Sequence, residues 1–144
     1  MAARMIPLST LVVDDEQIIC TLLQEWLVSA GHSVVTAHGG VDAGEAIKQR
    51  QFDLVITDVL MPHGDGLDLI TELKKVQPGA RIIAMSGGGR YVEGDDYLRL
   101  AKCIGAHAAV MKPFAWQELQ AAIELAVAAQ PPPAWSGTGS RAAA

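Results

Sequence analysis

The sequence predicts an α/β fold, in which helices cover both faces of a parallel sheet. Five short segments rich in apolar or β-branched residues alternate with five longer segments that carry apolar residues at helical spacing. Such alternation is typical of parallel sheets. The strand segments are also nearly continuous in apolar residues, whereas strands with one wet face alternate apolar and polar residues. At 144 residues, half of them apolar, the chain can form one domain with a substantial core.

Each predicted element ends at a polar or turn-forming residue. The predicted strands are residues 9–13, 33–37, 54–57, 81–85 and 108–111, of which the second is the weakest. The predicted helices are residues 16–30, 41–51, 66–76, 91–104 and 116–130. The first helix places Ile19, Leu23 and Trp26 near one face and stops at Gly31, a suitable C-cap. Residues 8–130 therefore form the predicted domain, between a lead-in at 1–7 and a disordered tail at 131–144 whose "GSRAAA" end could be vector-derived.

The composition excludes several classes of function. A formal net charge of -5 argues against non-specific nucleic-acid binding, which needs clustered Lys and Arg. No apolar run reaches the roughly 18 residues that span a bilayer, and no signal peptide is visible, so we expect a cytoplasmic protein. Cys20 and Cys103 are expected to be small buried groups, not a disulfide or a metal site. His63 and His107 lack metal-ligand spacing and are expected to be solvated loop or strand-end histidines.

Polar residues follow four of the predicted strands, and the carboxyl ends of parallel strands are where ligands bind in open α/β sheets. The first strand is followed by three acids at 14–16, the third by Asp58, the fourth by Ser86 and the fifth by Lys112. Each residue alone has an ordinary explanation, as a helix cap, a turn residue or a solvated lysine. Together at consecutive strand ends they indicate a functional edge.

These residue types suit phosphoryl transfer. Asp15 and Asp58 offer the oxygen ligands that Mg²⁺ prefers, and Asp14 could hold one of its waters. A carboxylate can also act as a nucleophile and accept a phosphoryl group. Lys112 is a suitable counter-charge, and the Ser86 hydroxyl can donate a hydrogen bond to a phosphoryl oxygen.

Four motifs, in order and at compatible spacing, give the chain a specific resemblance. They are "LVVDDE" (11–16), "FDLVITDVLMPHGDG" (52–66), "IIAMSG" (82–87) and "GAHAAVMKPF" (105–114). The chain resembles a response-regulator receiver domain of bacterial two-component signalling, from about residue 8 to residue 130. The resemblance implies a flavodoxin-like, doubly wound (βα)₅ fold with five parallel strands in the order 2-1-3-4-5.

The resemblance also implies a role for each residue at the strand ends. Asp58 becomes the phosphoacceptor, which receives phosphate from a phosphohistidine on a histidine kinase or histidine phosphotransfer protein. Asp14 and Asp15 become the acidic pair that holds Mg²⁺ together with Asp58, and the backbone carbonyl of Leu60 becomes a further metal ligand. Ser86 becomes the switch hydroxyl and Lys112 the phosphoryl counter-ion, with a cis bond between Lys112 and Pro113.

Two departures from the family pattern concern the output signal. Ala109 stands where the family usually has Tyr or Phe three residues before the lysine, so a relay through an aromatic rotamer is not available there. The stretch from Ser86 to Lys112 is a few residues longer than usual and opens with "GGGR" at 87–90. A plain flexible loop is the first interpretation of this segment. An order–disorder switch that repositions the helix at 91–104 is the second.

The sequence thus predicts a stand-alone receiver that is not an enzyme beyond its own phosphoryl transfer and autodephosphorylation. We expect Mg²⁺ as its cofactor, a phosphohistidine donor and a downstream protein as its partners, no direct DNA or membrane binding, and a phosphorylation-linked homodimer as an option. One alternative is a phosphorelay intermediate or the receiver portion of a hybrid histidine kinase. The other is a receiver-like adaptor that works without phosphorylation.

Overall fold

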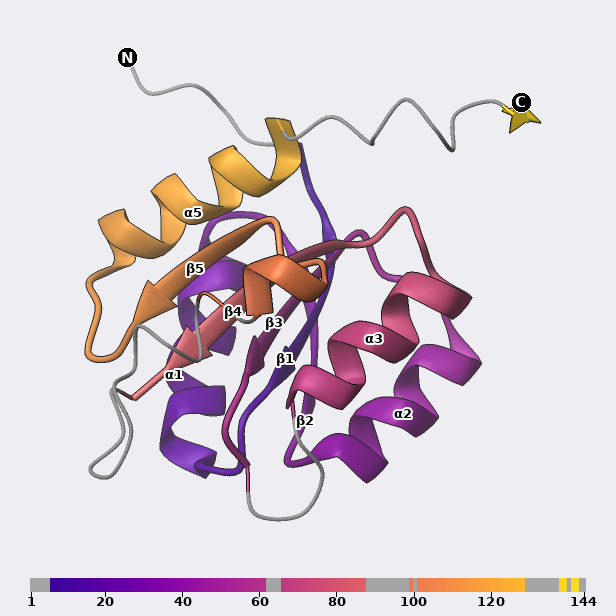
Figure 1. Ribbon diagram of the computed structural model, residues 1–144. Helices are drawn as coiled ribbons and strands as arrows, with labels where there is room; N and C mark the ends of the chain where they lie inside the picture. Colours follow the sequence, from indigo (N-terminus) through magenta and orange to yellow (C-terminus); the bar gives the residue numbers. More distant parts are fainter. Residues whose placement is uncertain are drawn as a thin grey trace.

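A five-stranded parallel sheet forms the centre of the molecule, in the order β2-β1-β3-β4-β5 (Figure 1). The computed structural model describes residues 6–61, 66–87, 99 and 101–128, and the backbone of 138–139 and 141–142. The strands are β1 (Ser9–Val13), β2 (Ser33–Ala37), β3 (Leu54–Asp58), β4 (Arg81–Ser86) and β5 (Ala108–Met111). The predicted fold class and strand order are confirmed. Strands β3 and β4 each run one residue further than predicted, so Asp58 and Ser86 are themselves strand residues.

Four described helices cover the sheet, α1 and α5 on one face and α2 and α3 on the other (Figure 1). They are α1 (Gln17–Ser29), α2 (Gly40–Gln49), α3 (Gly66–Val76) and α5 (Trp116–Ala128). Helix α1 ends one residue earlier than predicted, at Ser29 with Ala30 as its C-cap, and Gly31 follows with a φ of 101°, a conformation that glycine adopts without strain. Of the helix predicted at 91–104, Arg99 and residues 101–104 are helical, and the remainder lies outside the described residues.

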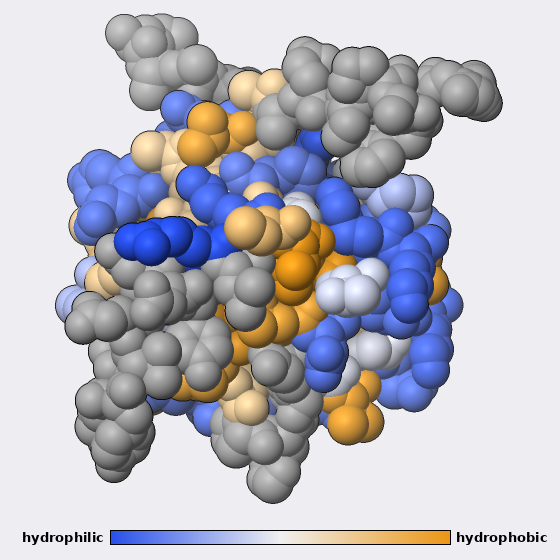
Figure 2. Space-filling model, in the orientation of Figure 1, coloured by the Kyte–Doolittle hydropathy of each residue, from blue (hydrophilic) through white to orange (hydrophobic). Residues whose placement is uncertain are grey.

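The core has two layers because successive strand residues point to opposite faces of the sheet. Leu11, Val13 and Val55 pack with α2 and α3, whereas Val12, Leu54 and Ile56 pack with α1 and α5. Every residue of β3 is buried, as expected for a central strand covered on both sides. The side of the surface over α2 and α3 is largely hydrophilic in Figure 2, although Val41 of α2 and Val76 of α3 are also exposed.

Neutral side chains bind backbone groups at the amino ends of the strands. His32 Nδ1 accepts the Leu8 N–H at 3.0 Å, and His107 Nδ1 accepts the Ile82 N–H at 3.0 Å. Gln77 Oε1 accepts the Phe52 N–H at 2.9 Å. His107 is a strand-end histidine, one of its two expected placements, but it is half-buried and its ring hydrogen-bonds the backbone of β4. His63 lies outside the described residues.

Cys20 is buried and Cys103 is exposed, and both are free thiols, so the prediction that both are buried was wrong for Cys103. Residues Thr138–Gly139 (β6) and Arg141–Ala142 (β7) form a two-residue antiparallel pair, and the disordered tail stays a prediction. Within the described part of the chain, no helix combines the length and the apolar character needed to cross a bilayer.

Candidate functional site

The sheet register brings the predicted site residues to one edge, where the strands end. In the register of the ladder, Asp58 pairs with Met85, and Ser86 pairs with Met111. Backbone hydrogen bonds continue beyond the strands, from Lys112 N–H to the Ser86 carbonyl at 2.7 Å and from Asp14 N–H to the Ala37 carbonyl at 3.1 Å. These hydrogen bonds therefore hold the main chain at Asp14, Ser86 and Lys112, so the geometry of the site depends on the side chains.

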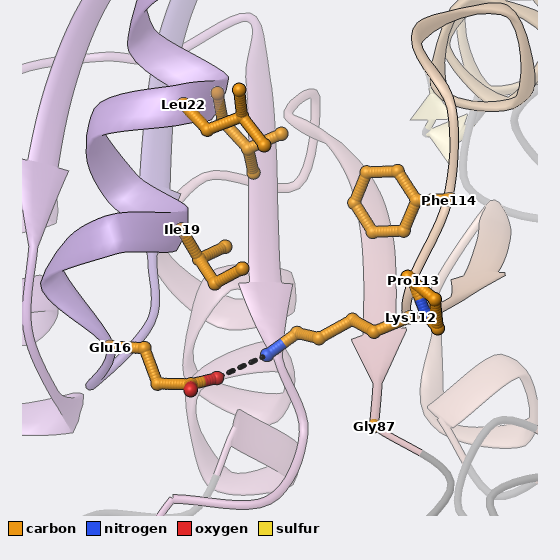
Figure 3. Close-up of a pocket in the computed structure, with 8 residues that line it drawn as sticks. Glu16, Ile19, Leu22, Gly87, Lys112, Pro113 and Phe114 are labelled. Carbon is orange, nitrogen blue, oxygen red and sulfur yellow. Dashed lines mark hydrogen bonds and ion pairs between the residues drawn. The ribbon is translucent and has the colours of Figure 1, made fainter.

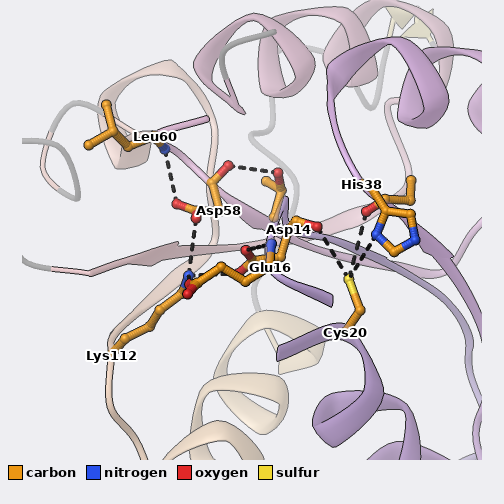
Figure 4. Close-up of polar contacts among 9 residues, drawn as sticks. Asp14, Glu16, Cys20, His38, Asp58, Leu60 and Lys112 are labelled. Atoms are coloured by element: carbon orange, nitrogen blue, oxygen red, sulfur yellow. Dashed lines mark hydrogen bonds and ion pairs between the residues drawn. The ribbon is translucent and has the colours of Figure 1, made fainter. Parts of the chain in front are cut away.

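The ammonium group of Lys112 forms ion pairs with the carboxylates of this edge (Figure 4). Lys112 Nζ lies 2.6 Å from Asp14 Oδ2 and 3.0 Å from Asp58 Oδ2. It also lies 3.5 Å from Glu16 Oε1. The Asp14 and Asp58 side chains are 0% and 7% exposed, and that of Lys112 is 12% exposed. A buried charge needs a partner of opposite sign, and here the partners come from the ends of three different strands.

The second oxygen of each buried carboxylate is held by the backbone. Asp14 Oδ1 accepts the Glu16 N–H at 2.9 Å, and Asp58 Oδ1 accepts the Leu60 N–H at 3.0 Å. The first contact lies just ahead of α1, but the N-cap residue of this helix is Glu16 and no side chain caps it, so Asp14 is not the helix cap that its ordinary explanation proposed. Both side chains are thereby fixed in orientation, with one oxygen on an amide and the other on the ammonium.

Burial and shared charge together set the protonation behaviour of this edge. Burial raises the pKa of both the Asp14 and the Asp58 carboxyl groups, and Lys112 only partly opposes this. For Lys112, burial alone would lower the pKa, but its hydrogen bond to Asp14 and the charge of Asp58 outweigh burial, so its pKa is raised. The raised pKa of Lys112 is consistent with the raised pKa values of Asp14 and Asp58. The single ammonium is stabilised by several carboxylates, whereas these carboxylates share one ammonium.

The acids of this edge fit a divalent cation. Carboxylate oxygens of Asp14, Asp15 and Asp58 lie within 4.8 Å of one another, and Asp15 is exposed to solvent. Hard carboxylate oxygens with open access to water are what Mg²⁺ prefers, because it keeps several of its waters. Two of the three acids already contact Lys112, and the negative charge still exceeds the positive charge there. The donor set therefore fits Mg²⁺, which the structure does not contain.

Ser86 and Leu60 lie near this edge of the sheet, and their predicted roles stay predictions. Ser86 is 1% exposed and is the last residue of β4, beside β3. Leu60 turns its N–H to Asp58, and the metal-ligand role of its carbonyl stays a prediction. The peptide bond between Lys112 and Pro113 is cis, as predicted. Ala109 pairs with Ala84 in the ladder, and residues 88–90 lie outside the described residues.

Sequence reasoning assigned no role at the site to Gly66 and Cys20. Gly66 begins α3, and a Cβ there would overlap the Asp58 carbonyl oxygen and lie 2.7 Å from Val59 Cα. Glycine at this position thus lets α3 pack directly on the backbone of Asp58, and the signal in the sequence is a glycine at a helix start. The Cys20 thiol donates to the Asp14 carbonyl at 3.3 Å, and burial raises its pKa to about 11.

Comparison with known proteins identifies the family. The sequence profile of the response regulator receiver domain matches residues 10–124. The chain belongs to this family. It is 38% identical over 124 residues to the DNA-binding transcriptional regulator NtrC of Azospirillum brasilense, covering 86% of this chain. It matches only 25% of that regulator and 26% of the ZraR regulator of Escherichia coli O157:H7, so the receiver spans about a quarter of these relatives.

Two solved structures place the receiver among its relatives. The receiver domain of NtrX from Brucella abortus superposes with a TM-score of 0.76 at 32% identity, covering 85% of this chain and 100% of that one. A response regulator from Burkholderia pseudomallei, solved with a phosphorylated aspartic acid, a calcium ion and citrate, gives 0.71 at 27% identity, covering 79% and 65%. The chain is thus a receiver domain of two-component response regulators in both sequence and fold.

Proposed function

We propose that this receiver accepts a phosphoryl group on Asp58 from a phosphohistidine of a histidine kinase or histidine phosphotransfer protein. The observation that carries the proposal is the Asp58 carboxylate, buried at the end of β3 between an ammonium and two further acids. A relative from Burkholderia pseudomallei with a phosphorylated aspartic acid and a cation supports it. The domain proposed for this activity spans residues 8–130.

The chemistry is a displacement at phosphorus. An Asp58 carboxylate oxygen forms the new bond to phosphorus while the bond to the donor histidine nitrogen breaks, and that nitrogen leaves with the electron pair of the broken bond. The Leu60 N–H holds one oxygen of Asp58 in place, and Lys112 neutralises charge at the other. Asp14, Asp15 and Asp58 would hold Mg²⁺, with the Leu60 carbonyl as a further ligand, and bound Mg²⁺ offsets negative charge on the transferred group.

Phosphorylation is proposed to act through Ser86 and Lys112, which lie at the ends of the adjacent strands β4 and β5. Ser86 can donate to a phosphoryl oxygen, and Lys112 can exchange a carboxylate for it. Ala109 provides no aromatic ring, so we propose that the change travels through the β4 end and the segment after it. The phosphorylated receiver then acts on a downstream protein. The intact ion cluster at Asp58 argues against the alternative of a receiver-like adaptor that works without phosphorylation.

Labelling with a small phosphodonor tests the proposal. Incubation with acetyl phosphate and MgCl₂ should add one phosphate to the protein, as read by intact mass, and Asp58→Asn should abolish the addition. Asp68→Asn is the matched control, because Asp68 is an exposed acid on α3 whose loss should leave labelling unchanged. Chelation of Mg²⁺ should suppress labelling of the wild type. Labelling that persists in Asp58→Asn would show that Asp58 is not the acceptor.

A further inference from the structure

Glu16 is an exposed acid that nevertheless reaches the buried ion cluster. Its side chain is 64% exposed, yet Oε1 lies 3.5 Å from Lys112 Nζ. Figure 3 shows the pair bridging a groove between α1 and the segment after β5, with Ile19, Leu22 and Phe114 along its walls. The groove has a volume of about 350 Å³. The alkyl stem of Lys112 lies along this groove, and its charged end meets Glu16 on the far side.

The backbone of Glu16 is fixed more firmly than its exposure suggests. Its N–H donates to Asp14 Oδ1 at 2.9 Å, and its carbonyl accepts the Cys20 N–H at 3.2 Å. Glu16 is the N-cap residue of α1 in extended conformation. The main chain therefore holds this side chain at the entrance of the site, and only the carboxylate end needs to be ordered for contact with Lys112.

The three acids that contact Lys112 differ in what else they can bind. A lysine ammonium has three donors, and here Asp14, Asp58 and Glu16 supply three acceptors. Asp14 and Asp58 belong to the acid trio that fits a divalent cation, whereas Glu16 does not. Lys112 and a bound cation would thus share the oxygens of Asp14 and Asp58. Glu16 is the acceptor that Lys112 can keep when those two are engaged elsewhere.

We propose that Glu16 is a positioning residue for Lys112, which retains the ammonium beside the site when the oxygens of Asp14 and Asp58 turn to a divalent cation. The proposal rests on the proposed function, because it concerns the lysine that meets the phosphoryl group. Without Glu16, Lys112 remains a stronger competitor for Asp14 and Asp58, so cation binding weakens.

Binding of MgCl₂ to the unphosphorylated protein tests this without any phosphoryl transfer. Amide NMR shifts give the dissociation constant of Mg²⁺ for the wild type and for Glu16→Gln. Because exposed ion pairs contribute up to about 1 kcal/mol, Glu16→Gln should weaken Mg²⁺ binding about two- to fivefold at low salt. Glu45→Gln is the matched control, because Glu45 is also 64% exposed and also pairs with a lysine, so it removes the same charge away from the site.

A second substitution separates positioning of Lys112 from a general effect of charge. In a Lys112→Met background, Glu16→Gln should leave the dissociation constant unchanged, because its partner is absent. An equal weakening in both backgrounds would mean that Glu16 acts directly on the cation and would overturn the proposal. An unchanged or tighter constant in Glu16→Gln alone would also overturn it, as would a wild type that binds no Mg²⁺.

The lysine itself provides a readout that needs no destabilised variant. The ¹⁵N resonance of the Lys112 ammonium should stay sharp in wild-type protein saturated with Mg²⁺, and should broaden by fast exchange with water in Glu16→Gln. A signal that is equally sharp in both proteins contradicts the proposal. Labelling of Asp58 by acetyl phosphate is measured separately, so a receiver that takes up phosphate normally while failing these tests loses only the role of Glu16.

Discussion

The two edges of the sheet use polar side chains in opposite ways. At the carboxyl edge, charged side chains bind one another, as Lys112 does with Asp14 and Asp58. At the amino edge, neutral side chains bind backbone groups, as His107 and Gln77 do. Both sets are largely buried and both connect neighbouring strands. The amino edge also has a charged acceptor, because Asp53 Oδ2 accepts the Ser9 N–H at 2.8 Å, but that contact is exposed. Among the described residues, the buried ion pairs lie at the carboxyl edge.

We interpret the amino edge as serving stability and the carboxyl edge as the site of the proposed chemistry. Backbone N–H groups at the starts of parallel strands have lost a ladder partner, and a buried N–H without an acceptor is costly. Uncharged acceptors supply the partner with little desolvation penalty. Buried charges stabilise a fold poorly in comparison, because desolvation offsets their attraction. A fold that keeps three acids around one ammonium is therefore set up to bind something else there, and substitutions at each edge can test this.

The largest effect is expected from removing the ammonium. Lys112→Met keeps the alkyl stem but leaves the buried Asp14 and Asp58 carboxylates without their counter-charge. Breaking a buried ion pair from one side costs about 3 kcal/mol of unfolding free energy at neutral pH. Urea unfolding of the Mg²⁺-free protein measures this loss, and saturating MgCl₂ should recover part of it. Lys48→Met, at an exposed pair with Glu45, should change little, and an equal loss there would break the comparison.

A somewhat smaller loss is expected at the amino edge. Gln77 is 4% exposed, and its amide joins three backbone groups, accepting from Phe52 N–H and donating to the carbonyls of Ile47 and Arg50 at 2.8 Å each. Gln77→Ala leaves these buried groups unpaired and should cost about 2 kcal/mol. Added MgCl₂ should stabilise this variant as much as the wild type, because its carboxyl edge is unchanged.

The control for this prediction is Gln49→Ala, the same chemical change at an exposed position of α2. Urea unfolding should show it within about 0.5 kcal/mol of the wild type. If Gln77→Ala altered Mg²⁺ binding as well as stability, the two edges would be coupled and the distinction between them would fail.

A smaller, pH-dependent effect is expected from His107. Its Nδ1 accepts a backbone N–H, and burial, with the charges of Lys74 and Arg81 nearby, lowers its pKa from 6.5 to about 4. Between these values the unfolded chain holds the proton and the folded protein does not. The stability that His107 contributes is therefore complete above pH 6.5 and is lost as the pH falls toward 4.

His107→Asn isolates this contribution, because its side-chain oxygen can still accept the N–H but does not titrate. The difference in unfolding free energy between the wild type and this variant should be constant above pH 6.5 and should move in favour of the variant below it. Comparison with the variant removes the contribution of the acids at the carboxyl edge, whose raised pKa values act in the opposite direction. A difference that is flat from pH 7 to pH 4 would show that His107 is not held neutral.

The carboxyl edge could be predicted from the sequence and the amino edge could not. Asp58 and Lys112 each end an apolar run, so local patterns alone bring them to one edge once the strands are parallel. Gln77 and His107 follow no comparable pattern, because each binds a backbone N–H 25 residues away, and any residue except proline offers that partner. Glu16 was visible among the acids after β1, but its contact with Lys112 spans 96 residues and depends on the start of α1.

The smallest effect is expected from the two thiols, of which only the buried one reports on the opening of an edge. Cys20 lies 3.3 Å from the Asp14 carbonyl and is fully buried, and burial raises its pKa to about 11. Cys103 is exposed near the amino edge, two residues before Gly105. An aromatic disulfide reagent should therefore react promptly with Cys103 alone, because only an accessible thiolate attacks it. Cys103→Ser should leave a single slow thiol.

Adding MgCl₂ should slow Cys20 further without changing Cys103, because a cation at the acids opposes opening of that edge only. An unchanged rate at Cys20 would show that a cation does not restrain the carboxyl edge, and slowing of Cys103 as well would show that MgCl₂ acts on the reaction with the reagent itself.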